Sequence, residues 1–206
     1  MLEIFTGSSL AAAAGMNAYI PLLMVGLMNR FLPQFIALPD GWAWLSNGWV
    51  LVIIGVLLVV ELIADKIPAI DSINDILQTV VRPASGGLVF GSSSGATTAA
   101  VTDPAEFFTS NQWIPIAVGV LIALVVHGAK ALGRPLANTV TGGTAAPVLS
   151  TAEDFGAIAL SILAIVLPVL AAIGVVILVV LTVVSMRRRR RKRAEKLKPA
   201  AEQAAS

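Results

Sequence analysis

The stretch that decides the fold is WVLVIIGVLLVVELIADKIPAIDSINDILQTVVRPASGG, residues 49–87. Its first part, residues 49–66, is an apolar run long enough to cross a bilayer as a helix. Ionisable side chains gather at the end of this run and beyond it: Glu61, Asp65, Lys66, Asp71, Asp75 and Arg82. Charges at membrane depth are expensive and are usually kept where they pair, bind or move something. The stretch therefore indicates a membrane protein with a polar functional region.

The composition of the whole chain agrees with this interpretation. The chain is 57% hydrophobic and 13% charged, whereas soluble domains carry about 25% charged residues. Nine of the fourteen Lys and Arg lie in residues 187–198, so the rest of the chain is net acidic. The chain has no Cys and one His, which excludes disulfides, thiolate chemistry and a multi-His metal site within one chain. We therefore expect neither a metal nor a cofactor.

Further apolar runs predict an all-α, polytopic membrane domain over residues 1–186, with broken or re-entrant segments. About five transmembrane helices are expected, over residues 7–28, 49–66, 84–101, 113–131 and 155–186. Pro21 is expected to kink the first of these helices and Pro168 to bend the last, because proline removes a backbone hydrogen bond.

The segments between these runs are polar or unusually small. Residues 71–81 predict a short amphipathic helix at the membrane interface. Residues 84–101 are rich in Gly, Ser, Ala and Thr, which favours a tightly packed helix over a re-entrant segment. Residues 132–154 predict a Gly- and Pro-interrupted binding loop. The spacing of Thr151 and Asp154 predicts a capping box at the start of the last helix.

Sliding the chain by 64 positions aligns residues 49–83 with residues 113–147. Trp49 then falls on Trp113, and Lys66 falls on Lys130. One interpretation is a duplicated helical unit, which is typical of transporters whose site lies between two halves. The other is convergence of two apolar helices that end in similar anchoring residues. The pattern leaves both open.

Three blocks of the sequence carry a resemblance to a known family. They are SLAAAAGMNAYIPLL, ELIADKIPAIDSINDILQTVVRP and HGAKALGRPLANTVTGGTAAPVLSTAED. In combination they resemble the bacterial domain of unknown function 4126 family, over residues 7–155. The resemblance implies a small multi-pass protein of the bacterial plasma (inner) membrane. It carries over no substrate and no catalytic residue, so the chemistry has to come from the residues themselves.

The acidic candidates share helix faces. Glu61 and Asp65 are four residues apart, and two carboxylates so close do not both ionise cheaply when dehydrated. We expect either a cation between them or a proton on one of them. Asp71 and Asp75 repeat the spacing, as a binding pair or as a solvated pair. Asn17 is expected to form a hydrogen bond between helices or to face a pore.

The basic candidates form a matching face. His127, Lys130 and Arg134 follow one another at spacings of three and four. They either neutralise the carboxylates or, together with Arg82, line a cavity that holds an anionic group. Further candidates for this cavity, as backbone donors or as carboxylates at a helix start, are Gly142, Gly143, Glu153 and Asp154.

These residues predict a small transporter or permease for a substrate with an anionic, phosphate-like group. The substrate class is a small metabolite or a lipid, and Glu61 or Asp65 would couple its movement to protons. The rival interpretation is a membrane scaffold in which the charges only hold helices together. A lipid-phosphate-processing enzyme ranks third, because the motifs of that chemistry are absent, and no catalytic residue is assigned.

The last segment, residues 187–206, is a strongly basic tail that is predicted to be disordered. Basic residues directly after a membrane helix indicate the cytoplasmic side and attract anionic lipids. The tail lacks the interleaved aromatic residues of a nucleic-acid reader, so no nucleic acid is expected as a partner. Four of the five basic residues outside the tail favour the opposite orientation, but the tail should dominate. The sequence is compatible with a homo-oligomer.

Overall fold

A computed structural model describes residues 1–94, 111–141, 145–180 and 184. Within its helices, the side chains of residues 68–69, 71–72, 132–141 and 145–146 are not described. The described part of the chain is helical and contains no strand. Its elements are α1 (Leu2–Met16), α2 (Tyr19–Phe31), the 3-10 helix η1 (Asp40–Ser46), α3 (Gly48–Ala64), α4 (Pro68–Ser93), α6 (Trp113–Thr141), α7 (Ala145–Val166) and a further helix, Pro168–Val180.

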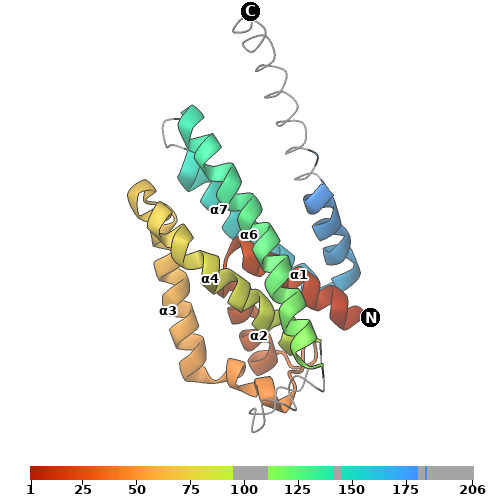
Figure 1. Cartoon of the computed structure of the whole chain (residues 1–206). Helices are drawn as coiled ribbons and strands as arrows, with labels where there is room; N and C mark the ends of the chain where they lie inside the picture. Colours follow the sequence, from red (N-terminus) through yellow and green to blue (C-terminus); the bar gives the residue numbers. More distant parts are fainter. Residues whose placement is uncertain (95–110, 142–144, 181–183, 185–206) are drawn as a thin grey trace, which may run out of the picture. The chain divides into compact units, whose positions relative to one another are not determined.

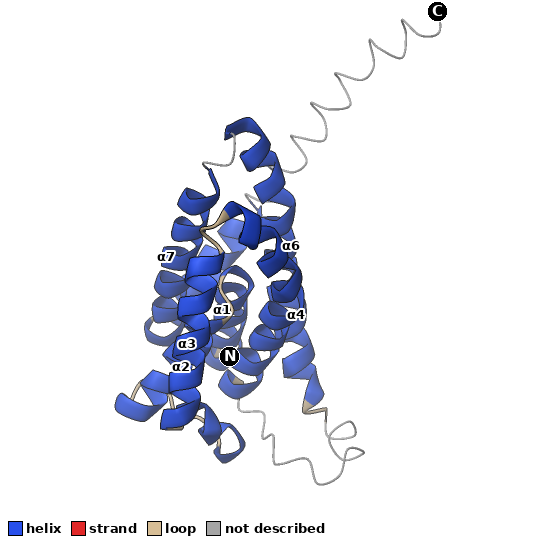
Figure 2. Ribbon diagram, turned by 90° about the vertical axis from the view of Figure 1, so that its left-hand side faces the viewer, coloured by secondary structure: helices blue, strands red, loops and turns tan. Residues whose placement is uncertain are grey.

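Helix α1 is the centre of the unit formed by residues 1–172. It packs against α4, α6 and α7, and Figure 2 shows it between α7 and α4. Its side chains are small enough for neighbours on every side, and the run from Ser9 to Gly15 is buried throughout. Small residues let helices approach closely and gain van der Waals contact. The sequence LAAAAG therefore fixes α1 in the interior.

Helices α4 and α6 make the most extensive helix pair (Figure 1). Glycines lie where the two backbones meet: a Cβ on Gly86 would come within 2.7 Å of the carbonyl oxygen of Gly119. On α4, Gly87 and Gly91 face Ile116 of α6 in the same way. The prediction of a tightly packed small-residue segment is therefore confirmed for residues 84–93, which belong to α4.

A larger side chain at this crossing should force the helices apart. We expect Gly119→Val to lower the free energy of unfolding by about 1–3 kcal/mol, the usual effect of overpacking. Gly55→Val is the matched control, because a Cβ on Gly55 meets nothing within 4 Å. Thermal unfolding of the detergent-solubilised variants measures the difference. Equal melting temperatures for the two variants would contradict the close contact of α4 with α6.

Among the described residues, two helices are long and apolar enough to cross a membrane, over Trp113–Ala131 and Pro147–Val166. A third qualifies if η1 and α3, which meet at 57°, count as one bent span. Helix α3 also presents a continuous apolar face, with 55–58% exposure at Val52, Ile53, Val56, Val59, Val60 and Ile63. Such a face suits a hydrocarbon environment. The described residues thus contain two or three candidate spans, where the sequence predicted about five.

The first predicted span, residues 7–28, is divided into two helices, and the break differs from the prediction. Helix α1 ends at Met16, and Asn17 has an extended backbone (φ −142°, ψ 124°). Pro21 lies in the first turn of α2, where its missing N–H group leaves no intrahelical bond unmade. The break is therefore at Asn17 and not at Pro21. At Pro168 the last predicted span is interrupted, since α7 ends at Val166 and a new helix begins at Pro168; the predicted bend stays a prediction.

Two predicted polar segments belong to long helices. Residues 71–81 form no separate interfacial helix, because α4 continues through them and past Pro83. Most of the predicted loop 132–154 is helical, in α6 and α7, and only residues 142–144 lie outside the described part. The capping box is wrong as well: Thr151 lies inside α7, and its hydroxyl donates to the carbonyl of Pro147 at 2.8 Å. Prolines within these helices are tolerated because neighbours and side chains satisfy the freed groups.

Candidate functional site

The break between α1 and α2 is held by the side chain of Asn17. Its Oδ1 accepts hydrogen bonds from the backbone N–H groups of Tyr19 and Ile20, both at 3.1 Å. These groups begin α2 and would otherwise lack partners. Its Nδ2 donates to Asp154 Oδ1 of α7 at 3.0 Å, as the prediction of a hydrogen bond between helices requires. Asn17 is completely buried, so one side chain both starts α2 and ties it to α7.

Lys130 of α6 serves the other side of the same break. Its Nζ donates to the carbonyl oxygen of Met16, the last residue of α1, at 3.3 Å. A cation there complements the partial negative charge of a helix C-terminus. The ammonium group also pairs with Asp65 Oδ2 at 3.2 Å and with Glu153 Oε2 at 2.8 Å. Lys130 thus joins α1, α6 and α7 to the segment that follows α3.

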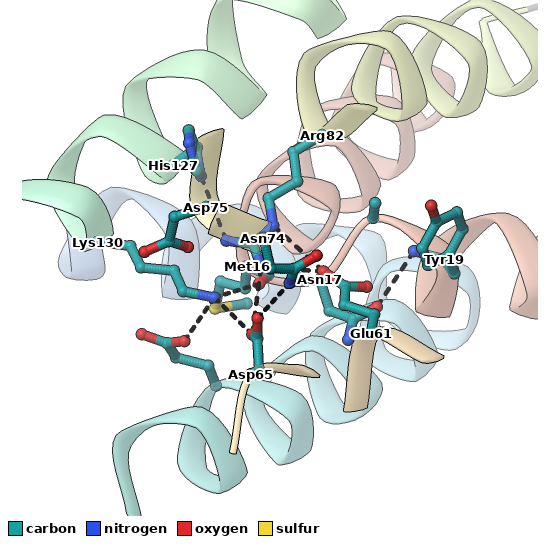
Figure 3. A network of polar contacts seen from close by, with 12 residues as sticks. Met16, Asn17, Tyr19, Glu61, Asp65, Asn74, Asp75, Arg82, His127 and Lys130 are labelled. Atoms are coloured by element: carbon teal, nitrogen blue, oxygen red, sulfur yellow. Dashed lines mark hydrogen bonds and ion pairs between the residues drawn. The ribbon is translucent and has the colours of Figure 1, made fainter. Parts of the chain in front are cut away.

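Arg82 of α4 lies at the centre of the charges (Figure 3) and is fully buried. Its Nη2 donates to Glu61 Oε1 at 2.9 Å and to Asp65 Oδ2 at 3.3 Å, and its Nε donates to the same Glu61 oxygen at 3.3 Å. A guanidinium group suits this role because it stays protonated and presents several donors in a fixed plane. Arg82 therefore holds both carboxylates at the end of α3 against α4.

The second terminal nitrogen of Arg82, Nη1, determines which ring nitrogen of His127 carries the proton. Arg82 Nη1 lies 3.2 Å from His127 Nδ1, and an arginine can only donate, so Nδ1 accepts. The ring proton is then on Nε2, which lies 3.1 Å from Thr79 Oγ1. The Thr79 hydroxyl in turn donates to the backbone carbonyl of Asp75 at 2.9 Å. His127 is thus an uncharged link between α4 and α6.

Lys66 and Asp154 form a second, smaller group. Lys66 Nζ lies 3.3 Å from Asp154 Oδ2 and donates to the carbonyl of Leu62 at 3.0 Å. Asp154 Oδ1 receives the amide of Asn17. The positive charge of Lys66 balances the negative charge of Asp154 in this group. We call the other group the charge cluster, and its members are Glu61, Asp65, Arg82, His127, Lys130 and Glu153.

Carboxylates outnumber cations in the ion pairs of the charge cluster that the described residues form. These pairs join three carboxylates, Glu61, Asp65 and Glu153, to two cations, Arg82 and Lys130. Asp65 is saturated, because Asn74 donates to its Oδ1 at 2.6 Å and both cations reach its Oδ2. Glu61 Oε2 is different: it is buried and has no hydrogen-bond partner among the described residues. Glu61 therefore carries a buried carboxylate oxygen to which no described residue donates a hydrogen bond.

The structure brings together most of the residues that the sequence singled out. Nine of them lie in the charge cluster or in the group around Asp154: Asn17, Glu61, Asp65, Lys66, Arg82, His127, Lys130, Glu153 and Asp154. Asp75 lies close to the cluster in Figure 3. The side chains of Asp71 and Arg134, and Gly142 with Gly143, lie outside the described residues.

Sequence reasoning missed Asn74 and Thr79, which hold Asp65 and His127. A signal was available for Asn74, because it precedes the buried Gln78 and Arg82 at spacings of four, which places all three on one face of a helix. No comparable signal existed for Thr79. The backbone carbonyl of Met16 could not have been foreseen either, since its role depends on where α1 ends.

A cavity of about 420 Å³ lies beside these groups, between α2, α3 and α7. Lys66 and Asp154 line it, whereas no member of the charge cluster does. The expected polar cavity between the two charged blocks stays a prediction, because several of its residues lie outside the described part of the chain. The described residues place the two blocks in direct ion-pair contact. No group of three or more metal-ligating side chains occurs among the described residues.

The fold and the buried charges define a helical protein, and the part of the chain that the structure describes has two or three segments suited to a membrane. The chain belongs to the family described as Domain of unknown function (DUF4126), whose model matches residues 4–188. This confirms the resemblance that the three sequence blocks carry. No curated protein and no solved structure matches the chain.

Proposed function

We propose that the protein is a small multi-pass transporter of the bacterial inner membrane, for a substrate with an anionic, phosphate-like group. A proton on Glu61 couples to the movement of that substrate. The observation that carries the proposal is the buried Oε2 of Glu61, which has no hydrogen-bond partner among the described residues, in a cluster whose described ion pairs join three carboxylates to two cations. Buried charges are stable when they are balanced, and a proton on this oxygen supplies the balance.

The broken helix supports the same proposal. In many transporters, discontinuous helices place their ends, with unpaired backbone groups, at the substrate and ion sites. Here the end of α1 meets Lys130 and the start of α2 is capped by Asn17. The break therefore lies beside the charge cluster, where a shift of α1 against α6 would alter the contacts of Lys130.

The order of events follows from the charges. The charged or titratable groups around Glu61 come from several elements: Tyr19, Asp65, Arg82 and Lys130. While Glu61 is ionised, the net negative charge repels an anion. A proton on Oε2 removes that repulsion and weakens the hold of Glu61 on Arg82. The guanidinium group can then donate to a phosphate-like oxygen. Proton and anion thus bind together and move in the same direction.

The same proposal includes the number of membrane crossings, the side of the C-terminal tail and the assembly of the protein. The chain crosses the membrane about five times, and the basic residues 187–206 remain in the cytoplasm and contact anionic lipids. Residues 49–83 and 113–147 are the two repeat units, and the protein can assemble as a homo-oligomer. Support comes from the basic run after the last apolar segment and from the matched Trp and Lys positions.

A scaffold is the second candidate, and a specific observation favours it. Arg82 is fully buried and the side chain of Lys130 is 5% exposed, and both are completely engaged in ion pairs. A cluster of this kind is also suited to a purely structural role, in which it joins α3, α4, α6 and α7. The two candidates differ in whether Glu61 exchanges a proton during a measurable transport reaction.

Reconstitution tests the proposal. Liposomes with purified protein and an internal pH indicator receive inorganic phosphate, a short phosphomonoester or a monocarboxylate from outside. We expect at least one phosphate-bearing anion to acidify the interior. Glu61→Gln, which is uncharged and cannot exchange a proton, should reduce this signal to the level of empty liposomes while the protein remains folded. Glu3→Gln, at the exposed start of α1, is the control. Equal signals from Glu61→Gln and Glu3→Gln would refute proton coupling at Glu61.

A further inference from the structure

The cavity between α2, α3 and α7 has an almost wholly apolar surface, and the polar residues Lys66, Thr151 and Asp154 lie at one end of it. Lys66, Leu62 and Leu58 line it from α3 and the residues just after α3, at spacings of four that form one stripe. From α7, Thr151 and Asp154 lie towards Lys66, and Phe155 and Ile158 follow along the helix. The lining from α2 is apolar: Ile20, Leu23 and Met24. A ligand that fits this lining has one charged or polar end and a long apolar remainder.

Lys66 is the residue at the polar end that can accept a ligand. Its ammonium group has three donors, and the described residues supply two acceptors, the carbonyl of Leu62 and Asp154 Oδ2. Its side chain is 39% exposed, whereas that of Lys130 is 5% exposed. Asp154 also accepts a hydrogen bond from the Asn17 amide through its other oxygen, Oδ1. One donor of Lys66 thus remains for an anionic group that arrives from outside.

The apolar end lies on the surface that suits hydrocarbon. Phe155 is 69% exposed and Ile158 is 40% exposed, although both line the cavity. On α3, the neighbouring outward residues Val59 and Ile63 are also apolar and more than half exposed. Lys66 follows the C-terminus of α3, where a membrane-spanning helix meets the head-group region. A lipid can therefore enter sideways from the bilayer with its head group level with Lys66.

The volume of the cavity limits the bound part of the ligand to one acyl chain. A cavity of about 420 Å³ is equivalent to roughly fourteen water-sized units of about 30 Å³ each, and a methylene group is similar in size. We propose that this cavity binds one acyl chain of an anionic membrane phospholipid, with the lipid phosphate on Lys66 and the second chain in the bilayer. The inference depends on the membrane location in the proposed function, but not on transport.

Native mass spectrometry of the intact, detergent-purified chain tests the site. The protein is first incubated with mixed micelles that contain equal amounts of phosphatidylglycerol and phosphatidylcholine. We expect one phosphatidylglycerol to remain bound. Ile158→Trp, which fills the cavity, should lower the bound fraction about tenfold, because most of the apolar contact of one chain is blocked. Ile162→Trp is the matched control: it lies on the same helix with the same 40% exposure, but does not line the cavity.

Lys66 variants test the head-group contact separately. Lys66→Gln should still retain a lipid but bind phosphatidylglycerol and phosphatidylcholine equally, and Lys66→Arg should restore the preference for phosphatidylglycerol. Equal retention by Ile158→Trp and Ile162→Trp would overturn the proposal, and so would an unchanged preference in Lys66→Gln. Retention of a free fatty acid in place of phospholipid would overturn it as well. These lipid-binding measurements do not require transport. They can therefore be interpreted even if the anion-transport assay gives no signal.

Discussion

Arg82→Met is expected to lower the free energy of unfolding by about 3–5 kcal/mol, the largest single effect in the chain. The methionine fills much of the space but donates no hydrogen bond. Glu61 and Asp65 then lose the guanidinium group that lies 2.9 Å and 3.3 Å from them, and His127 Nδ1 loses its donor. Buried carboxylates without a partner are strongly unfavourable. Thermal or SDS-induced unfolding in detergent measures the loss.

Two further variants show that the effect comes from the buried pairing. Arg30→Met removes an exposed arginine that donates to the carbonyl of Ser46, and should change stability by about 1 kcal/mol or less. Arg82→Met combined with Glu61→Gln should recover part of the loss, because one stranded charge is gone. If Arg82→Met and Arg30→Met unfold alike, Arg82 does not hold the cluster.

Lys130→Met should have the second largest effect, about 3 kcal/mol, because it removes the ammonium group that pairs with the buried Asp65 and the partly buried Glu153 and that lies at a helix end. Glu153 loses its partner at 2.8 Å, and the carbonyl of Met16 loses its donor at 3.3 Å. Asp65 keeps Arg82 and Asn74. The side chain of Glu153 is 21% exposed, so water can compensate part of the loss there.

A double-mutant cycle of Lys130→Met with Asp65→Asn separates the two candidate functions. We expect a coupling of about 2 kcal/mol in stability, since the two groups lie 3.2 Å apart and are both buried. Transport should remain lost in the double variant, because the site then keeps Arg82 but lacks the second cation that helps to balance the anion. Recovery of both stability and cellular function would instead favour the scaffold.

The acidic and basic faces were largely predictable. Glu61 and Asp65 at a spacing of four, and His127 and Lys130 at a spacing of three, follow from helical geometry, and opposite charges inside a membrane protein must meet. The interpretation that the basic face neutralises the carboxylates is confirmed for Lys130 with Asp65. Arg82 forms ion pairs with both carboxylates, which the sequence did not predict, and its contact with an anion stays a prediction.

The helix boundaries were not predictable to the same degree. Proline and glycine in residues 132–154 favoured a loop, but packing in the helical unit overrides such local preferences. The break at Asn17 depends on its side chain replacing backbone partners at the start of α2. A kink at Pro21 was the simpler expectation, because the bond to Asp154 joins residues 137 positions apart. A single sequence does not encode that contact in any local pattern. The repeat of residues 49–83 and 113–147 stays a prediction.

The central claim is that Glu61 holds an exchangeable proton within the buried charge cluster. Infrared difference spectroscopy of the protein in lipid measures this directly, because a protonated carboxylic acid has a carbonyl stretch that a carboxylate lacks. We expect a protonated-acid band that disappears in Glu61→Gln, persists in Asp65→Asn and shifts in intensity when a transported anion is added. A spectrum without such a band, or a band that is unchanged in Glu61→Gln, would contradict the account.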